Sequence, residues 1–460
     1  MPGWSKAGTS PRPPRHAYAD NTAPSYTYAC RLYPDNFRLV KGPSAIRLTA
    51  LANRRFRGLL LIWAGVPIAV LYLWGGLVEP LLLGTYQGDF QESYLRAAGR
   101  IAAGLDPYDL CQRFGCLEPT GPQYVMPPLL AWLLQPAVHV DGHALGVAVI
   151  IVLNAALVVF LWFALKALKV NDWQLAVLLV LVALTFGVTG NIEEGQVNLL
   201  LLALSGIWLL AWVDGGWWGG LALGGEVALK LIQAPVGVLV LAGRRWSMLA
   251  AAAATGIVLW LVAAPQYLLE YLFRVLPAIS AGTGLYENHS PGGTITRLFQ
   301  PDTFLGAVRG SPPTARAITL GIAVAALALT LWVLRPQAVA ATGRALEAGA
   351  IVAVTPIVAS YSWGTHLVLL LLPMLVLIAW GVRNLDWTVL GLVAAGYLFI
   401  SPGHHWLQAL LASGYSNLFV LRVMAEFGMV GIVAIWIASL LAVGRERNLR
   451  ASHGLAAEKC

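Results

Sequence analysis

Charged residues are scarce in this chain of 460 residues. Lys, Arg, Asp and Glu together make up 11% of the sequence, whereas hydrophobic residues make up 58%. Because a soluble domain carries roughly a quarter charged residues, this composition excludes an ordinary soluble enzyme. The many apolar runs of about 20 residues indicate an all-α polytopic membrane protein, since a helix satisfies its own backbone hydrogen bonds inside a bilayer.

Nucleotide-binding motifs and metal-binding patterns are also missing from the sequence. It contains no glycine-rich phosphate loop and no Rossmann fingerprint, which excludes enzymes that need a nucleotide-binding domain in the same chain. The four cysteines form no metal framework, and the adjacent His404 and His405 would point apart on a helix. We therefore expect no metal ion and no cofactor. Cys111 and Cys116 are close enough in sequence to form a small disulfide in an oxidising compartment.

Positive charges occur in short clusters between the apolar runs. A net charge of +8 would suit nucleic acid, but this clustering is typical of membrane orientation, so we expect no nucleic-acid partner. Arg54, Arg55 and Arg57 directly precede the first apolar run, which is too long for the core of a signal peptide. We expect residues 1–51 to be a disordered basic cytoplasmic tail, residues 52–443 a membrane-embedded domain, and residues 444–460 a cytoplasmic tail.

The positive-inside rule orients the predicted spans. Gly58–Val78 leads outward, so residues 79–143 form a first external loop. Within it, Pro127–Val140 is interpreted as an outer-surface or re-entrant helix, because a full crossing would place the lysines of the next connection outside. Trp217–Ala242 must be a broken hairpin or two short spans, with the break near Lys230. We expect about 10–12 transmembrane helices with both termini cytoplasmic.

Three external segments are long enough to contribute to a site. They are residues 79–143, residues 265–314 and a stretch that begins at Ser401. No long polar domain separates the apolar runs, so any chemistry has to take place in a cavity at the outer membrane face. A hydrophobic donor carried by a lipid is the natural substrate for such a cavity.

The most polar part of the first loop is the segment YQGDFQESYLRAAGRIAAGLDPY, in which Asp89 begins a run of helix-forming residues. One interpretation is that Asp89 caps this helix and Glu92 completes a capping box. The other is that Asp89 is a general base, because a carboxylate beside a cavity of low dielectric constant can accept the proton of an attacking hydroxyl. One carboxylate can serve both purposes.

Two arginines and a tyrosine share the same predicted helix. Arg96 and Arg100 are four residues apart, so they lie on one face. A guanidinium group can bind phosphate oxygens with two hydrogen bonds, which suits a lipid phosphate. The alternative is that the arginines neutralise Glu92 or contact lipid head groups. Tyr94 is a further candidate for substrate binding.

Polar residues recur near the outer ends of the next spans. The turn GNIEEGQVN contains Gln196 and Asn198, whose uncharged amides can hydrogen-bond sugar hydroxyls. Lys230 lies within the apolar stretch EVALKLIQAP. A lysine at membrane depth costs a few kcal/mol unless it is paired or hydrated, so it is a candidate for binding phosphate. The alternative is a structural ion pair with Glu226, one turn earlier.

Two motifs follow in the second half of the chain. NHSPGGTITRLF contains Asn288, Ser290 and Arg297, and Arg297 is a candidate phosphate ligand. SYSWGTHLVLL places Trp363 and His366 at the start of a span. A single histidine at a membrane edge is more often an interface residue than a catalyst, so both roles stay open for His366.

Together these motifs resemble glycosyltransferase family 87. The first loop reads D-F-x-x-Y-x-x-A and then G-x-x-P-Y, and the later segments read G-Q-x-N, N-x-S followed by R-L, and S-W-x-x-H. The sequence departs from the family pattern in the long spacing between Lys230 and Pro235, and in Thr365, where the family often has a second histidine. The resemblance covers most of the chain after Leu51.

This resemblance implies a C-type glycosyltransferase fold with an active site at the outer membrane face. It implies that a sugar, commonly mannose, is transferred with inversion from a polyprenyl-phosphate donor to a lipid or glycan acceptor. Asp89 and His366 would be catalytic, with Asp89 as the general base. The substrate-binding residues would be Glu92, Tyr94, Arg96, Gln196, Asn198, Lys230, Asn288, Ser290, Arg297 and Trp363.

Two alternatives stay open. The same fold can use another sugar, such as arabinofuranose, and the sequence does not separate the two. The chain could instead be a non-catalytic transporter of polyprenyl lipids or sugars. Transporters typically contain internal repeats with matching charges inside the membrane, whereas this sequence shows no such repeat and its ionisable residues cluster at the predicted outer face.

Overall fold

The chain is helical throughout the part that the structure describes. The computed structural model describes residues 54–84, 87–108, 123–305, 310–335 and 340–457, and no strand occurs in these ranges. The predicted tail of residues 1–51 lies outside them, as do all four cysteines and therefore the disulfide considered above.

The described ranges consist mainly of α-helices, which are joined by turns, loops and short 3-10 or π-helical segments. The helices are α2 (Arg54–Leu73), α3 (Glu79–Leu83), α4 (Arg96–Ala102), α6 (Pro128–Leu133), α7 (Gly142–Ala167), α8 (Trp173–Thr185), α9 (Val188–Glu193), α10 (Asn198–Asp214), α11 (Gly219–Leu229), α12 (Ala234–Ala242), α13 (Trp246–Val262), α14 (Leu268–Glu270), α15 (Leu276–Ser280), α16 (Pro291–Phe299), α17 (Pro313–Leu334), α18 (Ala341–Val358), α19 (Leu371–Asn384), α20 (Trp387–Ala412), α21 (Leu418–Ala425) and α22 (Phe427–Ala457).

Several of these helices are suited to crossing a membrane. Within the described ranges, six helical segments are long and apolar enough. They are Gly58–Leu82, Gly142–Ala167, Pro313–Leu334, Ala341–Val358, Gly364–Asn384 and Leu418–Ser452. A seventh would be the pair Trp246–Val262 and Pro265–Ser280, which is bent by 103°. The chain is thus an all-α polytopic membrane protein, and the expected 10–12 crossings require some of the shorter helices to cross as well.

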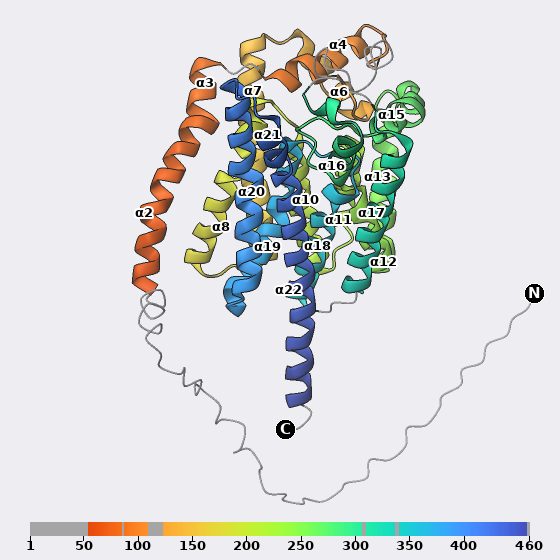
Figure 1. Cartoon of the computed structure of the whole chain (residues 1–460). Helices are drawn as coiled ribbons and strands as arrows, with labels where there is room; N and C mark the ends of the chain where they lie inside the picture. Colours follow the sequence, from red (N-terminus) through yellow and green to blue (C-terminus); the bar gives the residue numbers. More distant parts are fainter. Residues whose placement is uncertain (1–53, 85–86, 109–122, 306–309, 336–339, 458–460) are drawn as a thin grey trace, which may run out of the picture.

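Short helices gather at one end of the bundle, where α3, α4, α6 and α15 lie (Figure 1). α6 has six residues and is followed by a 3-10 turn, Gln135–His139. These pieces are too short to cross a bilayer, which needs about 20 helical residues. The segment Pro127–Val140 therefore does not cross, as expected from the sequence.

Basic residues mark the opposite end of the bundle. α7 starts after the short helices and is 26 residues long, so its last turn lies about 39 Å away. There Arg383 donates hydrogen bonds to the carbonyl oxygens of Leu168 and Lys169, at 2.8 and 3.1 Å. The Arg245 guanidinium carbon lies 4.5 Å from the centre of the Trp212 ring, at the end of α10.

The segment Trp217–Ala242 is a broken hairpin. Lys230 separates α11 from the helical turn that leads into α12, and its backbone is extended, with φ −159° and ψ 126°. Pro235 occupies the first turn of α12, where its missing N–H is tolerated. A Cβ atom on Gly215, before α11, would lie 3.5 Å from the Arg245 side chain, after α12. The two ends of the hairpin are therefore adjacent, and its tip carries Lys230.

The core of the bundle is formed by α10, α18 and α19. α18 and α19 are buried along most of their length, and Trp208 and Trp212 of α10 are 0% and 2% exposed. A helix that is apolar on all sides suits the centre of a bundle. By contrast, α2 and α17 expose large apolar side chains such as Trp63 and Trp332, as expected of helices that face lipid.

Two helices extend further than the sequence suggested. α20 continues to Ala412, so most of the stretch from Ser401 is helical. α22 continues to Ala457, through most of the segment expected as a C-terminal tail. Arg450 pairs with Glu446 at 2.7 Å in this extension. Opposite charges four residues apart favour a helix, which explains why α22 outlasts the apolar run.

Candidate active site

A cavity of about 730 Å³ lies beside the short helices, because residues of α15 and of the helical segment before α4 line it. Four parts of the chain form its wall: the first-loop helix, which consists of the segment Asp89–Leu95 and α4, the turn between α9 and α10, the tip of the α11–α12 hairpin, and the loop before α19. Cavities of this size are typical of small-molecule sites. Six residues predicted from the sequence line it: Asp89, Tyr94, Gln196, Lys230, Trp363 and His366.

Asp89 does not cap a helix. It occupies the first position of a π-helical segment, Asp89–Leu95, which follows Gly88 and has no side-chain cap. Its carboxylate instead accepts a hydrogen bond from the Gln196 amide, more than one hundred residues away in sequence. The structure therefore does not contain the capping box that was one interpretation of the sequence, and it leaves the carboxylate at the cavity wall.

A glycine allows the first loop to approach the turn between α9 and α10. The Phe90 N–H donates to the carbonyl oxygen of Glu194 at 3.2 Å. Gly195 follows with φ +65°, and a Cβ atom there would lie 2.6 Å from the Phe90 Cβ. A side chain at this position would be strained and would also clash. Gly195 thus permits the contact that brings Gln196 to Asp89.

Gln196 joins two side chains of the first-loop helix. Its Nε2 donates to Asp89, and its Oε1 accepts from the Tyr94 hydroxyl at 2.8 Å. Tyr94 and Gln196 are buried, at 2% and 6% exposed. Because both ends of the amide are engaged, Gln196 holds the Asp89 carboxylate in one orientation.

Asn198 holds the lysine at the hairpin tip. Its Oδ1 accepts from Lys230 Nζ at 2.9 Å, and its Nδ2 donates to the Asn191 side chain at 3.0 Å and to the Thr365 carbonyl at 3.1 Å. A longer contact of 3.4 Å joins the same amide to Gln196 Oε1. Asn198 is fully buried and does not line the cavity. It therefore acts from behind the cavity wall, where it holds Lys230 in place.

Lys230 is not paired with Glu226, the partner that the spacing suggested. Glu226 accepts instead from the Ser205 hydroxyl at 2.6 Å and from the Trp208 indole at 3.0 Å. Those contacts attach α11 to α10. The ammonium group of Lys230 donates to Asn198 instead. Since an ammonium group has three N–H donors, Lys230 keeps donors for a ligand in the cavity.

Burial shifts the ionisation of the carboxylates at the cavity. It raises the pKa of Asp89, and this effect is opposed by the Gln196 hydrogen bond and by the positive charge of Lys230. Burial also raises the pKa of Glu287, against the hydrogen bond from Tyr286 at 3.0 Å, and the charge of Asp89 raises it further. Within the described ranges, no three His, Cys, Asp or Glu side chains are arranged to hold a metal ion.

Aromatic rings form the part of the wall that precedes α19. The Tyr361 ring centre lies 5.9 Å from that of Trp363 and 5.8 Å from that of His366. All three residues line the cavity. His366 is 3% exposed, and its Nδ1 has no hydrogen-bond partner among the described residues. The rings are tilted by 53° and 51° against one another, and aromatic rings beside amides and carboxylates are suited to the apolar face and hydroxyl edge of a sugar.

Two first-loop residues that were predicted to bind substrate lie away from the cavity. Glu92 and Arg96 are on the helix that carries Asp89 and Tyr94, but neither lines the cavity, and Arg96 is exposed. Arg100 donates to the carbonyl oxygen of Asp106 at 2.6 Å, at the end of that helix. The arginine pair is therefore not directed at the candidate site.

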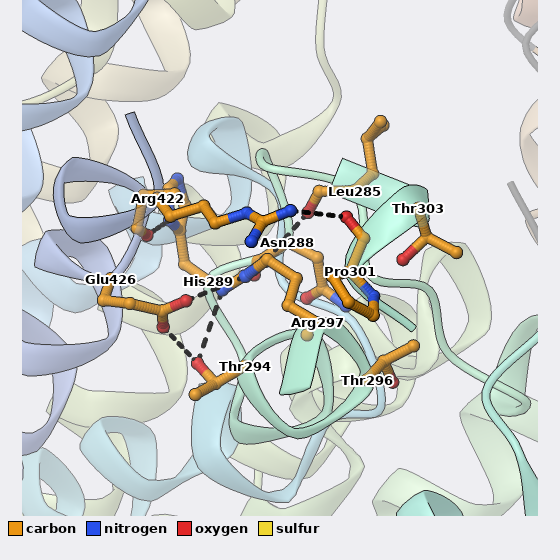
Figure 2. A network of polar contacts seen from close by, with 12 residues as sticks. Leu285, Asn288, His289, Thr294, Thr296, Arg297, Pro301, Thr303, Arg422 and Glu426 are labelled. Carbon is orange, nitrogen blue, oxygen red and sulfur yellow. Dashed lines mark hydrogen bonds and ion pairs between the residues drawn. The ribbon is translucent and has the colours of Figure 1, made fainter. Parts of the chain in front are cut away.

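Asn288, Ser290 and Arg297 belong to a second polar network, which also includes Leu285, Thr294 and Glu426 and which we call the loop clamp. Figure 2 shows Asn288 and Arg297 in this network. Arg297 Nε pairs with Glu426 at 2.8 Å, and Arg297 Nη1 donates to the carbonyl oxygens of Leu285 and Asn288, both at 3.0 Å. None of the three predicted residues lines the cavity. Arg297 is committed to protein groups, whereas Lys230 lines the cavity.

Three residues that the structure brings to the site are not among those predicted from the sequence. Glu287 and Tyr361 line the cavity, and Asn191 holds Asn198 from behind. Glu287 directly precedes Asn288, so its position next to a family motif was an available signal. Tyr361 lies two residues before Trp363, but nothing in the local sequence shows that both rings face one cavity.

The comparison with known proteins decides the family. The family model for Glycosyltransferase family 87 matches residues 124–360 of this chain, which is more than half of its length. The chain belongs to glycosyltransferase family 87. The matched region contains Gln196, Lys230 and Glu287, while Asp89 precedes it and His366 follows it.

Curated relatives agree with membership of family 87. Two proteins named alpha-(1->3)-arabinofuranosyltransferase, from two strains of Mycobacterium tuberculosis, are each 28% identical to the chain over 215 residues. The similarity covers 45% of this chain and 48% of each relative, so the chain spans about half the length of the curated relatives it matches.

Proposed function

We propose that this family 87 protein transfers a sugar from a polyprenyl-phosphate donor to a hydroxyl of a lipid or glycan acceptor, with inversion. One observation carries the proposal. The Asp89 carboxylate and the Lys230 ammonium group line the same cavity, and hydrogen bonds through Gln196 and Asn198 hold them there. The cavity thus offers a base and a cation in fixed positions.

Each of these groups has a chemical task in the proposed reaction. Asp89 accepts the proton of the acceptor hydroxyl while that oxygen bonds to the anomeric carbon. The bond between this carbon and the phosphate oxygen breaks, and the lipid phosphate leaves with the electron pair. Lys230 stabilises the negative charge on the leaving phosphate. Gln196 and Tyr94 hold the base, and Trp363 and His366 contact the sugar.

Two sugars are candidates for the group that is transferred. The family resemblance favours mannose, whereas the name of the mycobacterial relatives favours arabinofuranose. Both donors would present a lipid phosphate to Lys230 and an anomeric carbon to the acceptor. The described cavity residues supply uncharged amides and aromatic rings, which suit either sugar.

We also propose that the cavity opens to the extracytoplasmic side and that both termini are cytoplasmic. The support is that the cavity and a group of basic residues lie at opposite ends of the bundle. Lys169 and Arg383 lie where α7 ends, away from the short helices, and Arg245 lies on Trp212 in the last turn of α10, whereas the cavity is lined by the turn before α10. Basic residues are enriched on the cytoplasmic side of membrane proteins.

Transfer measured in sealed vesicles tests the donor and the sidedness together. Vesicles that contain the protein receive radiolabelled polyprenyl-phosphate mannose or polyprenyl-phosphate arabinofuranose from outside. We expect transfer with one donor in right-side-out vesicles and little in inverted vesicles, while a sugar nucleotide added alone supports none. Transfer from neither lipid donor would contradict the proposed function, and equal transfer in both vesicle types would contradict the proposed sidedness.

A further inference from the structure

We propose that Glu287 is a specificity-determining residue that binds a hydroxyl group of the acceptor. This inference rests on the proposed function. Glu287 lines the cavity together with Asp89 and Lys230. One of its oxygens, Oε1, accepts from the Tyr286 hydroxyl at 3.0 Å. A carboxylate has about four acceptor positions on two oxygens, so Glu287 keeps acceptor capacity for a ligand.

Charge decides which part of the substrate Glu287 can contact. A carboxylate repels the phosphate of the donor, which is drawn to the ammonium group of Lys230. The same carboxylate forms a strong hydrogen bond with a neutral hydroxyl, because one partner is charged. In a displacement with inversion the acceptor approaches on the side away from the leaving phosphate. A carboxylate that shares the cavity with the base therefore suits an acceptor hydroxyl next to the one that reacts.

The turn that carries Glu287 is held rigidly by the loop clamp (Figure 2). The Asn288 N–H donates to the carbonyl oxygen of Leu285 at 2.9 Å, which closes the turn around Glu287. Arg297 Nη1 donates to the carbonyl oxygens on both sides of that residue, at Leu285 and Asn288. The backbone on either side of Glu287 is thus fixed by one buried guanidinium group. A fixed carboxylate can discriminate between hydroxyl positions, whereas a mobile one cannot.

Asn288 connects this turn to the aromatic wall. Its Oδ1 accepts from the backbone N–H of Ser362 at 2.9 Å, and its Nδ2 donates to the Thr283 carbonyl at 2.8 Å. Ser362 lies between Tyr361 and Trp363, so one buried amide sets the position of the rings relative to Glu287. The N-x-S motif therefore acts behind the cavity wall, and Glu287 is the group that it presents to the ligand.

The loop clamp is anchored where α21 meets α22. Glu426 pairs with Arg297 and also accepts from the Thr294 hydroxyl. A Cβ atom on Gly428 would lie 2.3 Å from the His289 ring, so the chain passes this histidine at a glycine. Arg297 is accordingly a positioning residue, since it acts on the ligand only through Glu287 and the turn around it.

Binding of simple glycosides tests the proposal without any donor. The probes are octyl α-mannoside and octyl α-arabinofuranoside, titrated into purified protein. We expect Glu287→Gln to weaken the binding of at least one probe about ten-fold, because a hydrogen bond to a charged group is replaced by one to a neutral amide. Its thermal stability should match that of the wild type. Asp302→Asn, an exposed acid outside the cavity, is the matched control and should bind as the wild type does.

The outcomes separate this inference from the proposed function. Equal binding by the wild type and Glu287→Gln overturns the assignment of Glu287, as does a wild type that binds neither probe. A rise in the KM of the lipid donor in Glu287→Gln, with unchanged acceptor binding, also overturns it, because Glu287 would then contact the donor. Normal probe binding by a wild type that uses neither lipid donor would refute the donor and leave Glu287 in place.

Discussion

Two buried polar networks of this protein look alike in the sequence and differ in the structure. Each contains a basic residue, a buried asparagine that holds its surroundings, and a carboxylate. In the first, Lys230 donates to Asn198 and shares the cavity wall with Asp89. In the second, Arg297 directs four of its five N–H groups at Glu426, Thr294 and two backbone carbonyls, and it does not line the cavity.

The difference shows what a buried cation reveals about function. Burial of a charge requires partners, and those partners can come from the protein or from a ligand. For Arg297 the protein supplies nearly all of them, so the residue stabilises the fold of its loop. For Lys230 the protein supplies Asn198, and the remaining donors suit an anionic ligand. In the sequence both residues were candidates for binding phosphate, and only their contacts separate the two roles.

The largest expected effect comes from removing the base of the first network. Asp89→Asn should lower the rate of sugar transfer by about 100-fold or more, because the amide cannot accept the proton. The fold should survive, since Asn has the same size and can still hydrogen-bond Gln196. The measurement is transfer by purified protein, together with its thermal unfolding.

Glu92→Gln is the matched control for this prediction, because Glu92 lies on the same helix and outside the cavity. It should transfer sugar at close to the wild-type rate. Near-normal transfer by correctly folded Asp89→Asn would exclude Asp89 as the base, and Glu194 at the cavity edge would be the next carboxylate to examine.

A smaller effect separates the two cations directly. Lys230→Gln should raise the KM for the lipid donor about ten- to a hundred-fold, because a charged hydrogen bond to phosphate is lost. Arg297→Gln should leave that KM unchanged in the molecules that fold. It should instead lower the free energy of unfolding by about 3 kcal/mol, since Glu426 and two carbonyls lose their partner. Donor titrations and thermal unfolding of both variants measure the contrast.

Two outcomes would reverse the roles assigned to Lys230 and Arg297. A stable Arg297→Gln protein with a raised KM for the donor would place the phosphate at the loop clamp. An Lys230→Gln protein that unfolds readily and binds the donor normally would make Lys230 structural.

The smallest expected effect is a shift in pH dependence. Asp89 must be ionised to act as a base, and burial raises its pKa, so transfer should fall on the acid side at a pH above about 3.9, the ordinary value for Asp. The nearby charge of Lys230 lowers this pKa. Lys230→Gln should therefore move the acid limb of kcat/KM to higher pH, whereas Arg297→Gln should not move it. An unchanged limb in Lys230→Gln would show that the two charges do not interact.

The same pKa shift has a consequence for stability. Because the pKa of Asp89 is raised on folding, the native state holds this proton to a higher pH than the unfolded chain does. The unfavourable burial of the charge is therefore fully present above the folded pKa and disappears below the unfolded one. Any gain in melting temperature of Asp89→Asn over the wild type should shrink as the pH is lowered through this range.

Much of the fold follows from the sequence because membrane helices are local. A long apolar run and flanking arginines are enough to predict a span, and the short segment Pro127–Val140 and the break at Lys230 follow from length and proline placement. The extension of α22 past Val443 was missed, since pairs such as Glu446 and Arg450 stabilise a helix without an apolar run.

The site was predictable in its residue types, and only the tertiary structure decided their roles. The sequence alone determined that Asp89, Gln196, Lys230 and Arg297 are polar groups in an apolar chain, because the composition of each segment is a local property. It could not determine which of them share a cavity, since contacts between Asp89 and Gln196, or between Arg297 and Glu426, join residues more than one hundred positions apart. Whether a buried cation meets a protein group or a ligand depends on how distant helices pack.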